Sequence, residues 1–206
     1  MEYIILFSPL VAAILSGFFH KILGEKFCSY ITSLFVSISA ILSIIIFYNV
    51  LINSYENNII IAKWINSGSL EVNWAIKIDA LSSVMLVVVN LISSVVHIYS
   101  IGYMSHDPHK PRFMAYLSLF TFAMLTLVTS DNFLQLFFGW EGVGLCSYFL
   151  IGFWFKKNSA NSAAIKAFIV NRVGDFGFAL GIFLIFYLFG TVNYTEVFQN
   201  VSIYTN

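Results

Sequence analysis

Four ionisable side chains stand inside long apolar stretches of the sequence, where a charge is costly. They are Glu141, Lys166, Arg172 and Asp175. A charge at membrane depth costs about 2.5–3.5 kcal/mol on insertion scales, so such residues usually pair with one another or line a path for protons or ions. The expected chemistry is the transfer of protons between carboxylates and cations, and not the making of covalent bonds. We therefore treat these four residues as the candidate site of proton translocation.

Glu141 lies in a stretch, 132–155, that is long and apolar enough to be a spanning helix. Nine residues at about 1.5 Å each place it roughly 13–14 Å from one end, near the middle of a hydrocarbon core about 30 Å thick. Burial favours the neutral form of a carboxyl group and a nearby cation favours the charged form, so a cation that moves would change its protonation state. Gly139, Gly142 and Gly144 would let another helix approach closely. A proton relay and a structural carboxyl hydrogen-bonded to a neighbouring helix both fit this pattern.

Arg172 and Asp175 share one face of the predicted helix 161–189, because residues three apart are neighbours on a helix. They can form an internal ion pair near mid-depth, and a structural bridge fits as well as a proton-carrying pair. Lys166 precedes Asp175 by nine residues, which at 100° per residue points it to the opposite side of the helix. It can face a different neighbour or extend to the membrane interface.

Three histidines cluster near the end of the predicted helix 80–103. His97 lies inside the helix, whereas His106 and His109 lie in the loop that follows. This spacing supports a metal site only weakly and favours a polar loop. His97 is a further candidate for proton relay, since histidine titrates near neutral pH.

The elements that position these residues follow from composition. Of the 206 residues, 59% are hydrophobic and only 10% are charged, whereas a soluble domain carries about 25% charge. The fold class expected is an all-α integral membrane protein with about six transmembrane helices. The six stretches of suitable length are 3–20, 28–52, 80–103, 112–130, 132–155 and 161–189, and Pro111 is expected in the first turn of the fourth helix.

The loops between these helices differ in charge. Lysine and arginine gather in alternate loops, and the other loops are mainly acidic. Cytoplasmic loops carry the excess of lysine and arginine, so the N-terminus is predicted on the outer side. The basic residues are Lys21, Lys26, Lys110, Arg112, Lys156 and Lys157, and the acidic ones are Glu56, Glu71, Asp79, Asp131 and Glu196.

The long outer loop, 53–79, shows the period-two pattern of a β-strand. Apolar residues alternate with polar ones from Leu70 to Asp79, and a turn signal at 66–69 precedes them. We predict a β-hairpin that caps helix ends. The chain then divides into the first two helices (1–52), the hairpin loop (53–79) and the start of a helix bundle (80–206), whose last segment, 190–206, is polar and outside.

Several classes of protein are excluded by what the sequence lacks. The net charge is zero, which argues against a nucleic-acid partner. There is no dinucleotide fingerprint, P-loop, cysteine cluster or nucleophile elbow. We therefore expect this chain to bind no cofactor of its own, and any redox cofactor to sit in another subunit.

The motifs around the charged residues resemble a known family, the antiporter-like chain 5 (subunit L) of respiratory complex I. The resemblance runs from about residue 60 to 190, and the first two helices fit the family's topology. It rests on the runs Tyr99-Ser100-Ile101-Gly102-Tyr103-Met104, Asp107-Pro108, Arg112-Phe113, Leu134 to Tyr148 around Trp140-Glu141-Gly142, Lys166-Ala167-Phe168 and Asn171-Arg172-Val173-Gly174-Asp175. Subunits of Mrp-type sodium/proton antiporters share part of this pattern.

The resemblance implies roles for three residues. Glu141 matches the family's membrane-embedded glutamate, which works with a lysine on a later helix, and Arg172 and Asp175 match the charged pair on the sixth helix. Family members continue through a broken helix with that lysine, an inverted repeat and a long lateral helix, none of which this chain contains. It is then a truncated or split product, or the lysine comes from another polypeptide.

The resemblance also implies a function: a non-cofactor-bearing, proton-translocating membrane subunit of NADH:quinone oxidoreductase in a bacterial or mitochondrial inner membrane, with no activity alone. NADH, FMN, iron–sulfur clusters and quinone would bind to other subunits, and neighbouring antiporter-like subunits would be the main partners. The alternatives are a subunit of an Mrp-type cation/proton antiporter and a non-catalytic scaffold protein.

Overall fold

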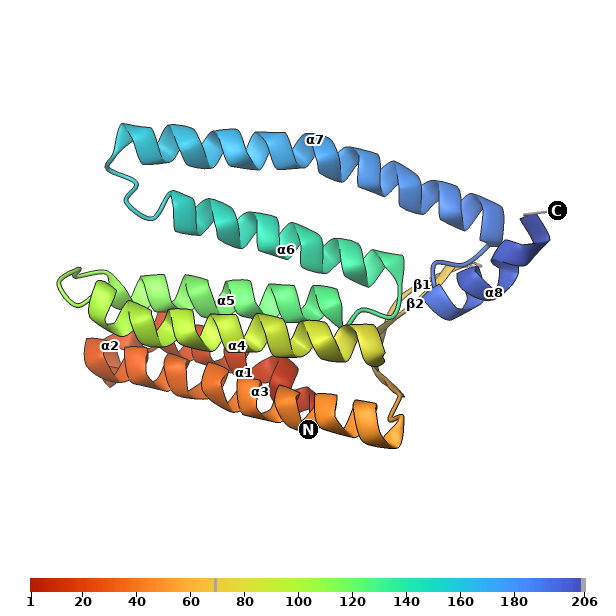
Figure 1. The fold of residues 1–206 in the computed structure, drawn as a ribbon. Helices are drawn as coiled ribbons and strands as arrows, with labels where there is room; N and C mark the ends of the chain where they lie inside the picture. The colour runs from red at the N-terminus through yellow and green to blue at the C-terminus, as the bar shows by residue number, and fades with distance from the viewer. Residues whose placement is uncertain (69, 205–206) are drawn as a thin grey trace.

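The computed structural model describes residues 1–68 and 70–204, and within them six long helices lie roughly side by side in one bundle (Figure 1). A short helix, α2, links the first two long ones, and α8 follows the last. The bounds are α1 Glu2–Phe18, α2 His20–Leu23, α3 Glu25–Asn53, α4 Ala80–Tyr103, α5 Lys110–Val128, α6 Phe133–Ile151, α7 Asn158–Phe189 and α8 Tyr194–Tyr204.

Five of these helices, α3 to α7, are long and apolar enough to cross a membrane. The sixth, α1, is apolar but has 17 residues, which at about 1.5 Å each is close to the lower limit for a span. The prediction of an all-α, multi-pass membrane protein with about six spans is confirmed.

The predicted helix ranges agree with the structure to within a few residues, and 80–103 coincides with α4. Pro111 lies in the first turn of α5, as expected. The largest difference is at the end of α6, which stops at Ile151 and not near 155. Gly152 is its C-cap, and a turn closed by the N–H of Lys157 on the carbonyl of Trp154 (2.8 Å) follows.

The bundle core lies among α1, α3, α4 and α5, while α7 packs mainly on α6 at the edge (Figure 1). The main apolar cluster includes Ile5, Leu6, Ile46, Leu86 and Leu125. The face of α7 that points away from α6 carries large exposed apolar side chains, such as Val173, Phe176 and Phe183. That face suits contact with lipid or with further helices.

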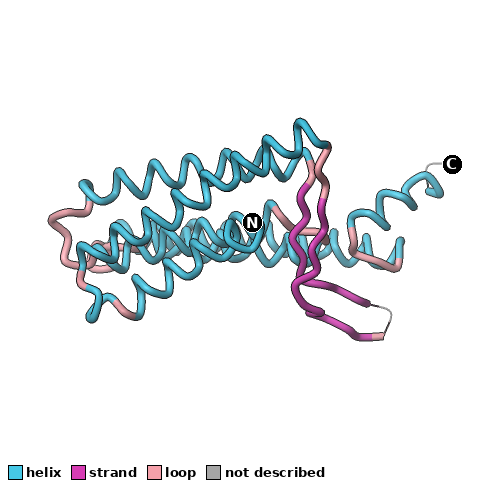
Figure 2. The backbone as a smooth tube through the Cα atoms, turned by 90° about the horizontal axis from the view of Figure 1, so that it is seen from below, coloured by secondary structure: helices cyan, strands magenta, loops and turns pink. Residues whose placement is uncertain are grey.

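The predicted hairpin is present as β1 Asn57–Ser67 and β2 Leu70–Ile78, which pair antiparallel (Figure 2). Ser67 pairs with Leu70; Ser69 of the expected turn lies outside the described residues. Val72, Ile76 and Ile78 are buried, as the period-two pattern predicts.

The hairpin is fastened to the start of α6. Gln135 is fully buried, and its side-chain amide both donates to the carbonyl of Ala75 (2.7 Å) and accepts from its N–H (3.0 Å). Asn132 caps α6 through the N–H of Gln135 and donates to the carbonyl of Asn73 (2.9 Å). The hairpin thus covers helix ends, and the binding to Gln135 explains why Ala75 is buried out of step with the alternation.

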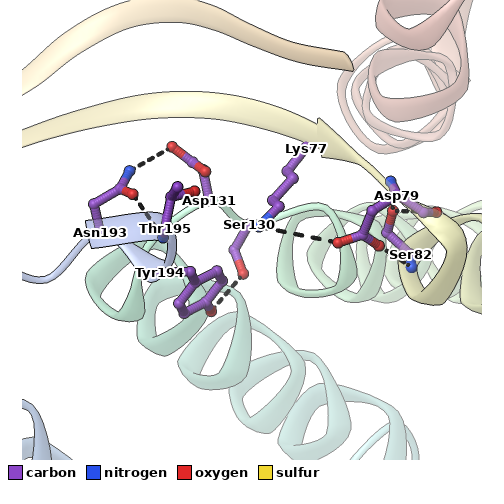
Figure 3. A network of polar contacts seen from close by, with 8 residues as sticks. All are labelled: Lys77, Asp79, Ser82, Ser130, Asp131, Asn193, Tyr194 and Thr195. Carbon is purple, nitrogen blue, oxygen red and sulfur yellow. Dashed lines mark hydrogen bonds and ion pairs between the residues drawn. The ribbon is translucent and has the colours of Figure 1, made fainter. Parts of the chain in front are cut away.

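Helix α8 differs from the sequence prediction, in which 190–206 is a polar outer segment without a helix. Its N-terminus is held by Asn193, which accepts from the N–H of Thr195 (3.0 Å) and donates to Asp131 (2.7 Å), as Figure 3 shows. The hydroxyl of Tyr194 pairs with Ser130 at 3.0 Å. The signal was available: Asn193 followed three residues later by Glu196 is a helix-start pattern.

Candidate functional site

Glu141 of α6 and Arg172 of α7 meet between the two helices. Guanidinium Nη1 lies 2.5 Å from carboxylate Oε1, so the pair is both an ion pair and a hydrogen bond. Glu141 is eight residues into a 19-residue helix, about 12 Å from its start, and therefore close to mid-depth. Arg172 is the cation that the sequence required beside Glu141 but did not identify.

Asp175 shares the same arginine. Its Oδ2 lies 4.0 Å from Nε of Arg172, at the limit of an ion pair. Its other oxygen accepts a hydrogen bond from the indole of Trp140 at 2.9 Å. The predicted Arg172–Asp175 pair is therefore present, but Glu141 is the closer carboxylate.

Trp140 is a site residue that sequence reasoning missed. It comes from α6 and reaches across to α7, so it fixes Asp175 while the adjacent Glu141 holds Arg172. The sequence feature that could have identified Trp140 is its position directly before Glu141 in a long apolar stretch. An indole donates one hydrogen bond and accepts none, so it can orient a carboxylate.

The cluster formed by Trp140, Glu141, Arg172 and Asp175 opens toward the uncovered side of α7. The side chain of Asp175 is 8% exposed, that of Glu141 25% and that of Arg172 52%. The guanidinium also lies 4.9 Å from the centre of the Phe168 ring, a distance typical of a cation–π contact. Arg172 thus has room to move, whereas Asp175 is held.

One cation serves two carboxylates in this cluster. With both acids ionised, one negative charge remains without a partner, which is unfavourable in a low-dielectric surrounding. Binding one proton at either carboxyl removes that charge. The cluster can therefore take up and release a proton as Arg172 shifts between the two acids.

Small residues bring α5 and α6 together beside this cluster. A Cβ at Gly139 would lie 2.7 Å from the backbone of Leu127, and one at Gly142 would lie 3.0 Å from Cβ of Ala123. The predicted close approach of another helix is thus confirmed at both positions, with α5 as that helix. A Cβ at Gly144 would meet nothing within 4 Å among the described residues.

Lys166 does not join the cluster. It is exposed near the opposite end of α7 from the hairpin, whereas Asp175 is buried nine residues further on. Among the described residues it forms no ion pair. Its separation from Asp175 follows the helical geometry expected from the sequence.

His97 is fully buried between α4 and α5, away from the acid–arginine cluster. Its Nδ1 lies 2.8 Å from the carbonyl of Ser93, and its Nε2 lies 3.0 Å from the hydroxyl of Ser118. A carbonyl only accepts, so Nδ1 carries the proton and Nε2 accepts from Ser118. Both ring nitrogens are satisfied, which suits a packing role; the relay role stays a prediction. His106 and His109 are exposed in the loop, as expected.

These features define a class: a multi-pass membrane protein with an acid–arginine cluster held between two of its spans. Two family descriptions match the sequence. Residues 64–114 match "NADH-Ubiquinone oxidoreductase (complex I), chain 5 N-terminus", and residues 130–206 match "NADH:quinone oxidoreductase/Mrp antiporter, TM". The chain belongs to the complex I chain 5 (subunit L) family.

Curated relatives agree over nearly the whole chain. NADH-ubiquinone oxidoreductase chain 5 of Triticum aestivum is 54% identical over 98% of this chain, which spans 30% of that relative. NADH-quinone oxidoreductase subunit L of Rickettsia bellii is 52% identical over 94% of this chain and 30% of its own length. The chain therefore spans less than a third of the relatives it matches.

The fold also occurs in a solved structure of an Mrp complex from Dietzia sp. The two structures superimpose with a TM-score of 0.79 at 21% sequence identity, and the superposition covers 95% of this chain and 20% of the chain in the Mrp complex. At that identity the likeness shows the shared fold alone.

Proposed function

We propose that this chain is a proton-translocating membrane subunit of NADH:quinone oxidoreductase, in which electron transfer elsewhere in the complex drives proton movement through the spans. One observation carries the proposal: the Glu141–Arg172 ion pair lies near the middle of the apolar helices α6 and α7, with Asp175 beside it. Ionisable groups at this depth are kept where they handle ions or protons.

The proposed cycle follows from the shared arginine. When Arg172 binds Glu141, that carboxylate is stabilised in its charged form. When the guanidinium moves toward Asp175, Glu141 loses its cation and takes up a proton. Return of Arg172 expels the proton, so movement of one cation converts a conformational change into a protonation change. The hydrogen bond from Trp140 keeps Asp175 in place as the alternative acceptor.

The sidedness is also proposed. The three loops rich in lysine and arginine lie at one end of the bundle, and the hairpin and α8 lie at the other (Figure 1). We place the basic end in the cytoplasm or mitochondrial matrix and the N-terminus outside, in a bacterial or mitochondrial inner membrane. Protons would then move toward the hairpin end.

Cofactors and partners follow from the family. NADH, FMN, iron–sulfur clusters and quinone are assigned to other subunits, and this chain is proposed to bind none of them. The uncovered side of α7, which borders the half-exposed Arg172, is where we propose that a later helix bearing the family's lysine packs. Neighbouring antiporter-like subunits are the proposed partners.

The test compares Glu141→Gln, Arg172→Gln and the double variant in the assembled complex. Proton uptake by vesicles and NADH:quinone oxidation are measured together. We expect each single variant to lose proton translocation, and the double variant to recover assembly but not translocation. Wild-type translocation in the double variant would mean that the pair is only structural and would refute the proposal.

A second function, a subunit of an Mrp-type cation/proton antiporter, is favoured by the match of residues 130–206 to a family description that names both NADH:quinone oxidoreductase and the Mrp antiporter. The antiporter and oxidoreductase functions differ in what drives the flux of protons. Proton flux that depends on sodium and proceeds without NADH would favour the antiporter, whereas flux that requires NADH and quinone favours the oxidoreductase.

A further inference from the structure

A groove of about 490 Å³ runs between α1 and α5 at the end of the bundle opposite the hairpin. Its walls are apolar. Small side chains make room for it: a Cβ at Gly17 would lie 3.6 Å from Cβ of Ala115. The apolar walls are formed by Leu10, Ala13, Ile14, Phe18, Ala115 and Leu119.

The groove opens to the surroundings of the bundle and not into its core. Phe18 is 81% exposed and Ile14 is 42% exposed on its rim. From Leu10 to Phe18 the wall of α1 extends about 12 Å along the helix axis. In a membrane the groove therefore runs from the helix ends toward the interior, along the direction of an acyl chain.

The mouth of the groove is basic. His20, His109 and Arg112 line it, and no acidic residue is among the described lining residues. Asp107 lies in the adjacent loop, and both its carboxylate oxygens accept hydrogen bonds: Oδ1 from the backbone N–H of His109 (2.8 Å) and Oδ2 from the indole of Trp154 (3.0 Å).

The arginine at the mouth is held in place. Nη2 of Arg112 donates to the carbonyl of Phe153 (3.1 Å), and the guanidinium lies 4.8 Å from the centre of that ring. Its Nε has no hydrogen-bond partner in the described part of the chain. Two segments lie at this end of the bundle: the link between α1 and α3, and the loop that leads into α5. Together they carry four lysine or arginine residues (Lys21, Lys26, Lys110 and Arg112) and two acids (Glu25 and Asp107).

We propose that this groove binds an anionic phospholipid, with one acyl chain along α1 and α5 and the phosphate at the His109–Arg112 end. The apolar wall supplies the site for the chain, since burial of each methylene in such a groove is favourable. The basic mouth selects a negative headgroup, because each cation near the membrane surface contributes about 1 kcal/mol, or roughly fivefold, toward anionic lipid.

The test uses the assembled complex in phosphatidylcholine vesicles that contain trace phospholipid with a photoreactive acyl chain. One probe is phosphatidylglycerol and the other phosphatidylcholine, and peptides are mapped after illumination. We expect the anionic probe to label the 10–18 and 112–119 segments about fivefold more than the neutral one. Equal labelling by the two probes, or no labelling because another part of the protein fills the groove, would overturn the proposal.

Two pairs of variants sharpen the test without touching the acid–arginine cluster. His109→Glu should lower labelling by the anionic probe about fivefold, whereas His106→Glu, in the same loop but outside the groove, should leave it unchanged. Ile14→Trp should block the groove for both probes, and Val11→Trp, equally exposed on α1 at 44%, should not. Equal effects within either pair would refute the assignment to this groove.

Discussion

Replacing Gly139 by alanine should separate α5 from α6. The new Cβ would lie 2.7 Å from backbone atoms of Leu127, whereas carbon atoms pack at about 3.5–4.0 Å. The helices must part by about 1 Å, because backbone cannot turn aside as a side chain can. Overpacking of this kind costs about 1–3 kcal/mol.

The matched control is Gly144→Ala, on the same helix but with no described residue within 4 Å of its Cβ. Both variants gain about 1 kcal/mol of helix propensity, so the difference between them isolates the contact with Leu127. Gly142→Ala, with 3.0 Å to Cβ of Ala123, should fall between the two.

The assay is thermal unfolding of the full-length subunit in its complex, followed by loss of the assembled species. A difference of 1 kcal/mol corresponds to about 2–4 °C for a unit of 150–250 residues and to less for a longer chain, so Gly139→Ala should melt measurably below Gly144→Ala. Equal melting temperatures would refute the close approach of α5 and α6 on which the site's geometry rests.

Three further predictions concern the ends of the bundle. Gln135→Leu should release the hairpin and raise its proteolysis, because both backbone groups of Ala75 lose their partners at about 1–3 kcal/mol each; unchanged cleavage would contradict this. Tyr194→Phe should cost about 1 kcal/mol through loss of the hydrogen bond to Ser130. Burial raises the pKa of Tyr194 to about 12. Because the folded pKa is raised, the phenol stabilises the fold below its unfolded pKa, and this stabilisation is lost as pH rises through about 12, which an ultraviolet titration would detect. Burial alone would raise the pKa of Asp107, but hydrogen bonds from His109 and Trp154 hold this pKa below its usual value. The ionised carboxylate therefore stabilises the fold above its unfolded pKa, and this stabilisation is lost as pH falls through the folded pKa. Asp107→Asn should weaken the acid dependence of unfolding, and an unaltered dependence would exclude this role.

The sequence by itself predicted the spans, the hairpin and the relation of Arg172 to Asp175. Each of these depends on local regularity: the length of an apolar run, alternation along a strand and the three-residue spacing on a helix. It also predicted that Lys166 points away from Asp175, since that depends on helical periodicity alone. The helix after Asn193 was missed although its capping pattern was present.

Only the tertiary structure decided which groups meet across helices. The spacing of residues along the sequences of α6 and α7 does not predict that Arg172 lies closer to Glu141 than to Asp175. It also does not predict that the indole of Trp140 reaches Asp175. The register of two packed helices depends on side-chain interlocking along the whole interface, including the contact of Gly139 with Leu127. Such contacts join residues far apart in the chain, so local patterns determine the elements and packing determines the site.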